Sequence, residues 1–170
     1  VNTKRGRLLE EFKLLFIVNG KGIFESGHCS RQEISAGTII LLFPGEWHNY
    51  SYDPDTGWDE YWVGFDGINV RNMMKSGFFS LSNPVFKIGI DDEFISFYKS
   101  IIDYAEREAT GYQQVASSIV RHMLGLLYFK NQNILFSNKE VVDKINQARI
   151  LIRDNISNPI SPAEIANQLG

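Results

Sequence analysis

Two short stretches rich in aromatic residues carry the side chains best suited to binding chemistry. The side chains of a β-strand alternate between its two faces, so residues two apart share a face. If residues 47–52 and 58–65 are strands, one face of each carries aromatic rings together with hydroxyl groups and a carboxylate. Such a combination orients a small polar ligand in a largely apolar pocket, and it suits a sugar. We therefore predict a ligand-binding site that includes His48, Tyr50, Trp58, Glu60 and Trp62.

Each of these residues also has a purely structural interpretation. Trp58 and Trp62 could fill the interior of a small barrel, because such barrels are commonly filled by their own side chains. His48 follows a turn and could form a hydrogen bond at the start of its strand. A carboxylate inside a barrel is costly unless it is paired, which favours either a functional role for Glu60 or a partner such as Arg5. Taken alone, Arg5 is better explained as a solvated charge near the end of the chain.

The composition limits what this protein can be. The chain has 170 residues, 44% of them hydrophobic, which is enough for one well-filled core. The net charge is −3 and no strongly basic segment stands out in the sequence, so we expect no positively charged surface for nucleic acid. We do not expect residues 1–5 to begin a signal peptide, since no apolar segment follows their charges, and no apolar run reaches the roughly 18–20 residues of a membrane helix. With a single cysteine, Cys29, no internal disulfide is possible, and we expect a cytoplasmic protein that contacts no membrane.

Residues 1–90 are predicted to form a β-barrel. Short β-rich runs alternate with turn residues in this part of the chain, which is typical of a sandwich or a small barrel. The expected strands lie at residues 12–18, 23–25, 31–34, 38–43, 47–52, 58–65 and 84–89, with a turn at 19–22, a hairpin tip at 26–30 and a short helix at 68–75.

After residue 90 the hydrophobic period becomes helical. Residues 91–131 are predicted to form a hairpin of two helices, the first capped by Asp91 or Asp92 and the second at about 113–130. The second helix is apolar over a wide arc, which would serve both the barrel and a partner subunit in a homodimer. A helix buried within one subunit explains the same pattern equally well. The predicted dimerisation residues are Ile119, Met123, Leu126 and Leu127.

The remaining chain is predicted to be a polar linker at residues 132–138 and a second helical region at 139–170. A helix is expected at 139–155. Ser161 at a cap position, Pro162 at the first helical position and Glu164 three residues after the cap then signal a new helix. The chain begins without Met and stops soon after that signal, so we interpret it as a fragment. An ordinary pair of C-terminal helices is the alternative interpretation.

Two separate stretches resemble the same known family. One of them, residues 145–170, resembles the first two helices of the DNA-binding domain in AraC/XylS-type transcription regulators. It includes the motif Ile160-Ser161-x-x-Glu164-Ile165-Ala166. The other stretch is residues 5–67. It resembles the sugar-binding cupin domain of that family through Arg5, Phe12-x-Leu14, Gly20-x-Gly22, Gly37-Thr38-Ile39, Leu41-Leu42-Phe43-Pro44-Gly45, His48-x-Tyr50 and Trp58-x-x-x-Trp62-x-x-Phe65-x-Gly67.

The resemblance implies a fold and a role. The fold would be mainly β plus α: a cupin-like jelly-roll barrel, two antiparallel helices and the first helices of a truncated helix-turn-helix domain. The role would be to sense a small-molecule effector, a carbohydrate by analogy, in a homodimer whose full-length form alone binds DNA. Arg5, Tyr50 and Trp62 fall where the family contacts its sugar. Glu60 replaces a histidine, which leaves the identity of the ligand open because an ionised carboxylate only accepts hydrogen bonds.

Cupin barrels also occur as metalloenzymes, so a metal-dependent sugar isomerase or oxygenase is the alternative function. Those enzymes usually present a His-x-His pair, whereas the matching stretch here is His48-Asn49-Tyr50. The other histidines, His28 and His122, lie in a predicted hairpin tip and a late helix, which is not a recognisable ligand spacing. Neither a nucleophile elbow nor a P-loop is present. We expect no enzymatic activity, no metal and no cofactor.

Overall fold

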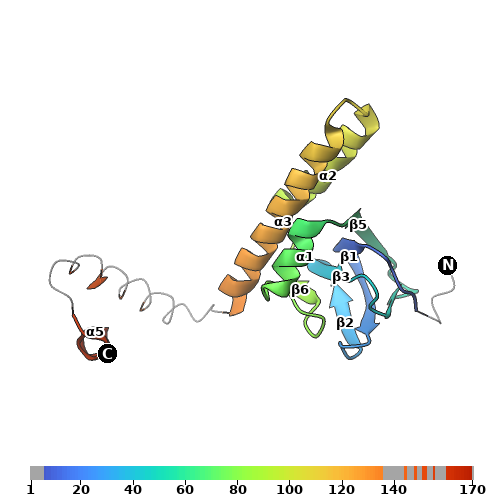
Figure 1. Ribbon diagram of the computed structural model, residues 1–170. Helices are drawn as coiled ribbons and strands as arrows, with labels where there is room; N and C mark the ends of the chain where they lie inside the picture. The colour runs from blue at the N-terminus through green and yellow to red at the C-terminus, as the bar shows by residue number, and fades with distance from the viewer. Residues whose placement is uncertain are drawn as a thin grey trace. The chain divides into compact units, whose positions relative to one another are not determined.

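The computed structural model describes residues 6–135, 144, 148, 151, 152, 155 and 160–169. The chain divides into two compact units, Val1–Asn131 and Gln132–Gly170. The elements that begin in the first unit are β1 (Phe12–Ser26), β2 (Gln32–Ser35), β3 (Thr38–Leu42), β4 (His48–Tyr52), β5 (Trp58–Phe65), α1 (Ile68–Lys75), β6 (Val85–Lys87), α2 (Asp92–Arg107) and α3 (Tyr112–Leu135) (Figure 1).

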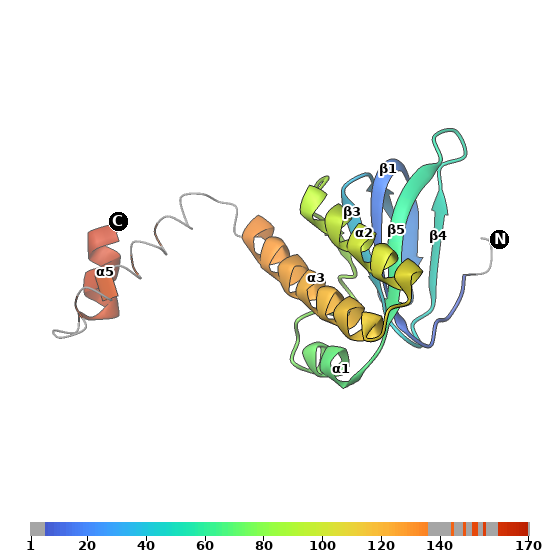
Figure 2. The ribbon, with the colours of Figure 1, turned by 90° about the horizontal axis from the view of Figure 1, so that it is seen from above.

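Strand β1 organises the sheet because it pairs with four other strands. Its first half, from Phe12 to Ile17, lies between β3 and β5, and its second half, from Lys21 to Ser26, pairs with β2 and β4. All these pairings are antiparallel, and β6 extends the sheet beside β3. The result is a curled antiparallel half-barrel with helices on one side (Figures 1 and 2). This confirms the predicted fold class, a cupin-like jelly roll with mainly β plus α structure.

The predicted turn at residues 19–22 is wrong, because β1 continues through it without reversing. A register shift between Ile17 and Asn19 marks a bulge, at which a strand bends. Gly20 follows with a φ of +78°, and a Cβ there would lie 2.1 Å from the carbonyl oxygen of Gly57. Glycine is needed at this position because the backbone is left-handed and another strand end lies against it. Glycine, which predicted a turn at this position, instead permits the strand to bend.

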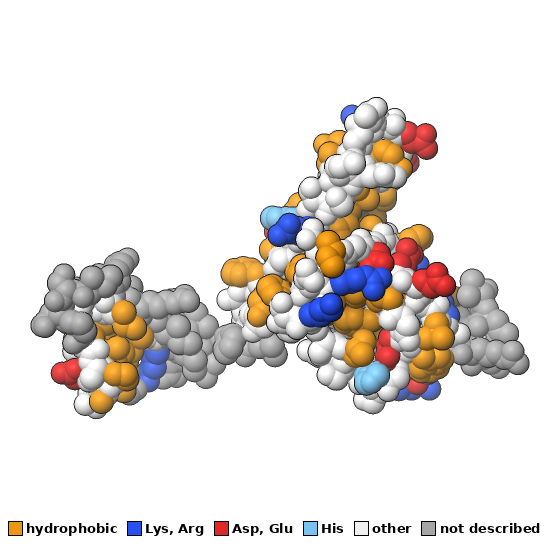
Figure 3. All heavy atoms as spheres, viewed as in Figure 1, with side chains coloured by type: hydrophobic (Ala, Val, Ile, Leu, Met, Phe, Trp, Pro, Cys, Tyr) orange, Lys and Arg blue, Asp and Glu red, His pale blue; other side chains and the backbone are white. Residues whose placement is uncertain are grey.

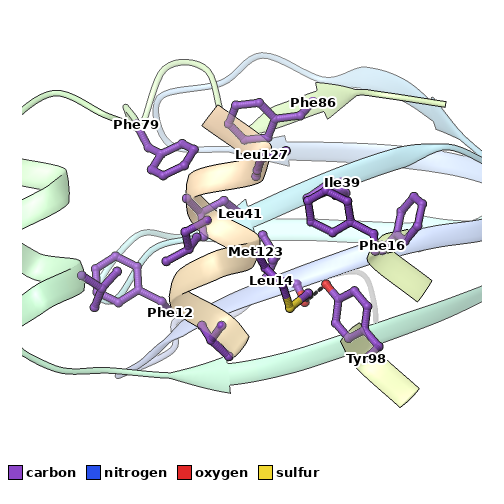
Figure 4. Close-up of a cluster of buried hydrophobic side chains, with 14 of the residues drawn as sticks. Phe12, Leu14, Phe16, Ile39, Leu41, Phe79, Phe86, Tyr98, Met123 and Leu127 are labelled. Carbon is purple, nitrogen blue, oxygen red and sulfur yellow. Dashed lines mark hydrogen bonds between the residues drawn. The ribbon is translucent and has the colours of Figure 1, made fainter. Parts of the chain in front are cut away.

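The alternation of side chains along β1 gives the sheet two apolar faces. Figure 2 shows α2 and α3 lying across one of these faces. The cluster on that face joins β1 and β3 to the two helices and includes Phe12, Leu14, Phe16, Ile39, Leu41, Phe94, Tyr98, Met123 and Leu127 (Figure 4). The cluster inside the curl of the sheet includes Leu15, Ile17, Phe24, Ile34, Ile40 and Leu42.

Hydrogen bonds and an ion pair attach α2 to the sheet and to α3. Asp91 caps α2 as predicted, accepting a hydrogen bond from the backbone N–H of Phe94 at 3.1 Å. The same carboxylate lies 2.7 Å from Nζ of Lys130, near the end of α3. The buried Tyr98 hydroxyl donates a hydrogen bond to the carbonyl oxygen of Leu14 on β1 at 3.1 Å (Figure 4). The helical pair is therefore attached to the central strand by a polar contact as well as by apolar packing.

Two of the four predicted dimerisation residues are not at the surface. Met123 and Leu127 are 0% exposed because they pack against the sheet within their own subunit. Their assignment to a contact with a partner subunit is therefore wrong. Ile119 and Leu126 remain partly exposed. The apolar arc of α3 is wide mainly because the helix lies on the sheet.

In the second unit, α5 (Pro162–Leu169) begins with the predicted capping box. The backbone N–H of Ser161 donates to Oε2 of Glu164 at 2.7 Å, and the N–H of Glu164 donates to Oγ of Ser161 at 3.3 Å. Most of the predicted helix at 139–155 lies outside the described residues. Helix α3 continues to Leu135, so the predicted linker at 132–138 begins inside a helix and its start is corrected. No helix among the described residues is long and apolar enough to cross a membrane.

The buried hydrogen bond of Tyr98 can be tested by removing one oxygen atom. We expect Tyr98→Phe to lower the free energy of unfolding by about 1–2 kcal/mol, because the buried carbonyl of Leu14 loses a donor that water cannot replace. Tyr104→Phe is the matched control, since Tyr104 lies on the same helix and is 38% exposed. Urea denaturation followed by circular dichroism measures both. Equal stability of the two variants would contradict the assigned role of this bond.

Candidate functional site

The predicted binding residues of β4 and β5 line one cavity of about 410 Å³. Antiparallel pairing sets both strands against β1, with Tyr50 opposite Phe24, and Glu60 opposite Ile17. Because Phe24 and Ile17 belong to the cluster inside the curl, their neighbours face the same interior. The structure brings together His48, Tyr50, Trp58, Glu60 and Trp62, while Arg5 lies outside the described residues.

The wall of the cavity is aromatic. The rings of His48 and Tyr50 stack with centroids 6.1 Å apart, and those of Tyr50 and Trp58 stack at 5.7 Å. Gly22 on β1 makes this possible, because a Cβ there would lie 2.7 Å from the Trp58 ring. Trp62 also lines the cavity and is 56% exposed. Trp62 therefore does not fill the core, whereas Trp58 packs against the apolar cluster inside the curl and also lines the cavity.

Two cationic residues that the sequence did not suggest complete the lining, Arg7 and Lys13. Arg7 is held against β4 by two backbone hydrogen bonds with His48, of 2.9 and 3.0 Å. Its guanidinium donates a hydrogen bond to the Tyr50 hydroxyl, and its Cζ lies 4.9 Å from the centroid of the Tyr50 ring. Nζ of Lys13 lies 4.2 Å from the centroid of the Trp62 ring.

A sequence signal existed for one of these two residues. Lys13 interrupts the apolar run of β1 and shares a face with Leu15 and Ile17, so strand alternation places it inside the curl. Arg7 precedes the first strand, and its position depends on an isolated pairing with His48 across 41 residues. No local pattern predicts such a pairing.

Glu60 is the half-buried carboxylate of the cavity. Burial raises the pKa of Glu60 above its ordinary value, and the opposing influences of Arg7, Lys13 and the Trp58 side chain do not cancel this rise. Its Oε2 is buried and has no hydrogen-bond partner among the described residues. Buried polar atoms are usually satisfied, so an orphaned oxygen on a residue that lines a cavity indicates a missing hydrogen-bond donor.

His48 presents a second acceptor. Its Nδ1 lies 3.1 Å from the backbone carbonyl oxygen of Glu46, and since a carbonyl only accepts, Nδ1 carries the proton. Burial lowers the pKa of His48, and the charges of Arg7 and Lys13 lower it further, so the ring is neutral. Nε2 is then an acceptor, and it is buried without a partner among the described residues. His48 also borders a second cavity of only about 10 Å³ between the sheet and Pro84.

The other histidines lie away from this cavity. His28 is at the tip between β1 and β2, where Nδ1 lies 2.9 Å from Oε1 of Glu46. His122 is on α3, and its ring centroid is 5.0 Å from that of Phe97. Within the described part of the chain, no three side chains of His, Cys, Asp or Glu gather as potential metal ligands.

A curled antiparallel half-barrel with an aromatic, polar-edged cavity and a helical pair on its outer face defines a class of small-molecule-binding domains. The family model of the AraC-like ligand binding domain matches residues 3–125. The chain therefore belongs to this family, whose members are ligand-sensing domains of regulators. This confirms the resemblance seen in the barrel motifs. A comparison with curated proteins found no match.

The raised pKa of Glu60 predicts a pH-dependent effect on stability. A carboxyl group that ionises less readily in the folded state binds more protons there than in the unfolded chain, so stability falls as the pH rises above 4.5, its ordinary value. At pH 7 the charged form costs stability. We therefore expect Glu60→Gln to raise the free energy of unfolding at pH 7 relative to wild type, and to have little effect below pH 4.5.

Urea denaturation at pH 7 and at pH 4 measures this difference. Asp59→Asn is the control, because Asp59 is the exposed neighbour on the opposite face of β5. A stabilisation by Glu60→Gln that is the same at both pH values would show that ionisation is not its cause.

Proposed function

We propose that this domain senses a carbohydrate in the cavity between β4 and β5, and that occupancy of the cavity controls DNA binding by the rest of a transcription regulator. The observation that carries this proposal is the buried, unpartnered Oε2 of Glu60, a residue that lines the cavity together with four aromatic side chains of β4 and β5, Tyr50, Tyr52, Trp58 and Trp62. A sugar matches both features, because its hydroxyls donate hydrogen bonds and its C–H faces pack on rings.

The geometry suggests how a sugar would be held. The stacked Tyr50 and Trp58 rings offer one apolar surface, and the exposed Trp62 offers another. Glu60 and Nε2 of His48 would accept hydrogen bonds from hydroxyls, and the unused N–H groups of Arg7 would donate to sugar oxygens. A cavity of about 410 Å³ lies within the usual range for small-molecule sites.

The regulatory part of the proposal rests on the family and on the second unit. The match over residues 3–125 supports a ligand-sensing role. The capping box at Ser161 and Glu164 fits the similarity of residues 145–170 to the start of a helix-turn-helix domain. We propose that a ligand acts by favouring one of two arrangements of the regulator, since a ligand that binds both equally shifts nothing.

We propose a homodimer as well, through the outer face of α3. Hydrophobic side chains are exposed along the α2 and α3 pair (Figure 3). A shallow groove on α3 is lined by Ser118, Arg121, His122, Gly125, Leu126 and Phe129. Gly125 and the small serine side chain would allow the close approach of a second helix. Leu126 and its partly exposed neighbour Ile119 would supply the apolar contact.

The carbohydrate site can be tested by combining ligand screening with loss of one aromatic surface. We expect at least one member of a panel of pentoses, hexoses, sugar acids and amino sugars to raise the melting temperature by mass action. Trp62→Ala should weaken that ligand roughly tenfold, about 1.4 kcal/mol, as measured by isothermal titration calorimetry. Tyr104→Ala, an exposed aromatic residue on α2, should leave affinity unchanged. The absence of any stabilising carbohydrate would overturn this proposed function.

The dimer face can be tested by placing a charge in the groove. We expect Leu126→Glu to shift the protein from dimer to monomer in sedimentation velocity over a range of concentrations, because burying an unpaired carboxylate is costly. Gln114→Glu is the control, an exposed position in the first turn of the same helix where an acidic residue is favourable. If Leu126→Glu sediments like wild type, the dimer does not use this face.

A further inference from the structure

Resting on the proposed function, we propose that the carbohydrate is acidic: a sugar acid whose carboxylate lies between Arg7 and Lys13 while its hydroxyls reach Glu60. The inference deepens the carbohydrate proposal by naming the class of ligand that the charges of the cavity favour. It depends on three observations: two cations that form no direct ion pair, a net positive lining, and two orphaned acceptors on residues that line the cavity.

Neither cation of the cavity forms a direct ion pair, although the charges of both act on Glu60 and oppose the rise of its pKa. Among residues 6–135, the ion pairs involve Lys21, His28, Arg71, Arg107 and Lys130, and neither Arg7 nor Lys13 takes part in one. The residues before Gly6 are Val-Asn-Thr-Lys-Arg, so that segment contains no acidic side chain that could neutralise them.

Both cations instead lie over aromatic rings at the cavity. Arg7 lies over Tyr50 and donates to its hydroxyl, and Lys13 lies over Trp62. A guanidinium has five N–H donors, so the Tyr50 hydroxyl leaves most of them free for a planar anion. Since both rings line the same cavity, an anion that binds there lies near both charges.

The lining carries an excess of positive charge. It holds Arg7 and Lys13 against one carboxylate, Glu60, and the neutral His48 does not alter this balance. Glu11 lies over Gly64 at the next position on that face of β5, but it does not line the cavity. An anion is attracted by this lining, whereas the ammonium of an amino sugar would meet two like charges.

The orphaned acceptors require that the acid also carry hydroxyls. Oε2 of Glu60 and Nε2 of His48 both need hydrogen-bond donors, which a carboxylate cannot supply. An apolar acid would satisfy the cations and leave both acceptors buried without partners, which is unfavourable. A polyhydroxylated acid meets both requirements and still presents C–H groups to Tyr50 and Trp58.

Matched ligands that differ in one charged group test the inference. Isothermal titration calorimetry at pH 7 would compare glucose with glucuronate and glucosamine, and galactose with galacturonate and galactosamine. We expect a uronate to bind at least tenfold more tightly than its neutral parent, and the amino sugar to bind most weakly. Raising the salt concentration should reduce the preference for the acid, because exposed charges are screened.

Variants assign the preference to the two cations. Arg7→Gln combined with Lys13→Gln should abolish the preference, so that the uronate and its neutral parent bind with equal affinity, and Arg7→Lys should keep most of the preference. Both positions are at least partly exposed, so the fold should tolerate these changes, which circular dichroism would verify. Lys21→Gln is the control, because Lys21 pairs with Asp53 away from the cavity lining and its loss should not alter the preference.

The outcomes separate this inference from the function on which it rests. Equal or tighter binding of the neutral or amino sugar overturns the acidic ligand and leaves a carbohydrate sensor in place. Binding of hexanoate as tight as that of the uronate overturns the requirement for hydroxyls. If no carbohydrate of any charge binds, the proposed function fails, and the inference fails with it.

Discussion

The central constraint in this molecule is that β1 must bury both of its faces. Its 15 residues pair with four other strands, and alternate side chains are apolar in both directions. One face is covered by α2 and α3, and the other can be covered only if the sheet curls back on itself. The bulge after Ile17 and the left-handed Gly20 provide the bend. Curling leaves a hollow at one side of the sheet, so the cavity is a product of the same burial that holds the domain together.

The polar groups of the cavity act against that burial. Glu60 and His48 each keep a buried atom without a partner, and the desolvation of Glu60 opposes its ionisation. A leucine or valine in either place would satisfy the apolar interior more simply. Polar groups that lower stability and converge on one hollow are typical of sites selected for binding, because a ligand supplies the missing partners.

Much of the fold could be predicted because strand alternation and helix caps are local signals. The strand predicted at residues 58–65 is β5, and Asp91, one of the two residues predicted to cap the next long helix, caps α2. The predictions were wrong where one sequence pattern fits two different structures. Gly20 and Gly22 mark a turn or a bulge equally well, and the apolar arc of α3 fits either a sheet or a partner subunit. Met123 and Leu127 face the sheet, so it is long-range packing within the subunit that distinguishes these two interpretations of the apolar arc.

The candidate site shows the same division. Period-two alternation on β4 and β5 placed five residues at one cavity, and antiparallel pairing with β1 brought the two strands together. Arg7 could not be found in this way, because it reaches the cavity through a bridge to His48 that has no local signature.

That bridge makes the start of the chain matter more for recognition than for folding. Arg7 is joined to the barrel by two backbone hydrogen bonds, and it belongs to neither apolar cluster. A shortened protein that begins at Leu8 would therefore keep its whole hydrophobic interior, and it would be expressed and melt much like the longer chain. It would nevertheless lack one wall of its cavity and half of its cationic lining. Expression level and melting temperature therefore do not show whether a fragment of this domain contains its complete cavity.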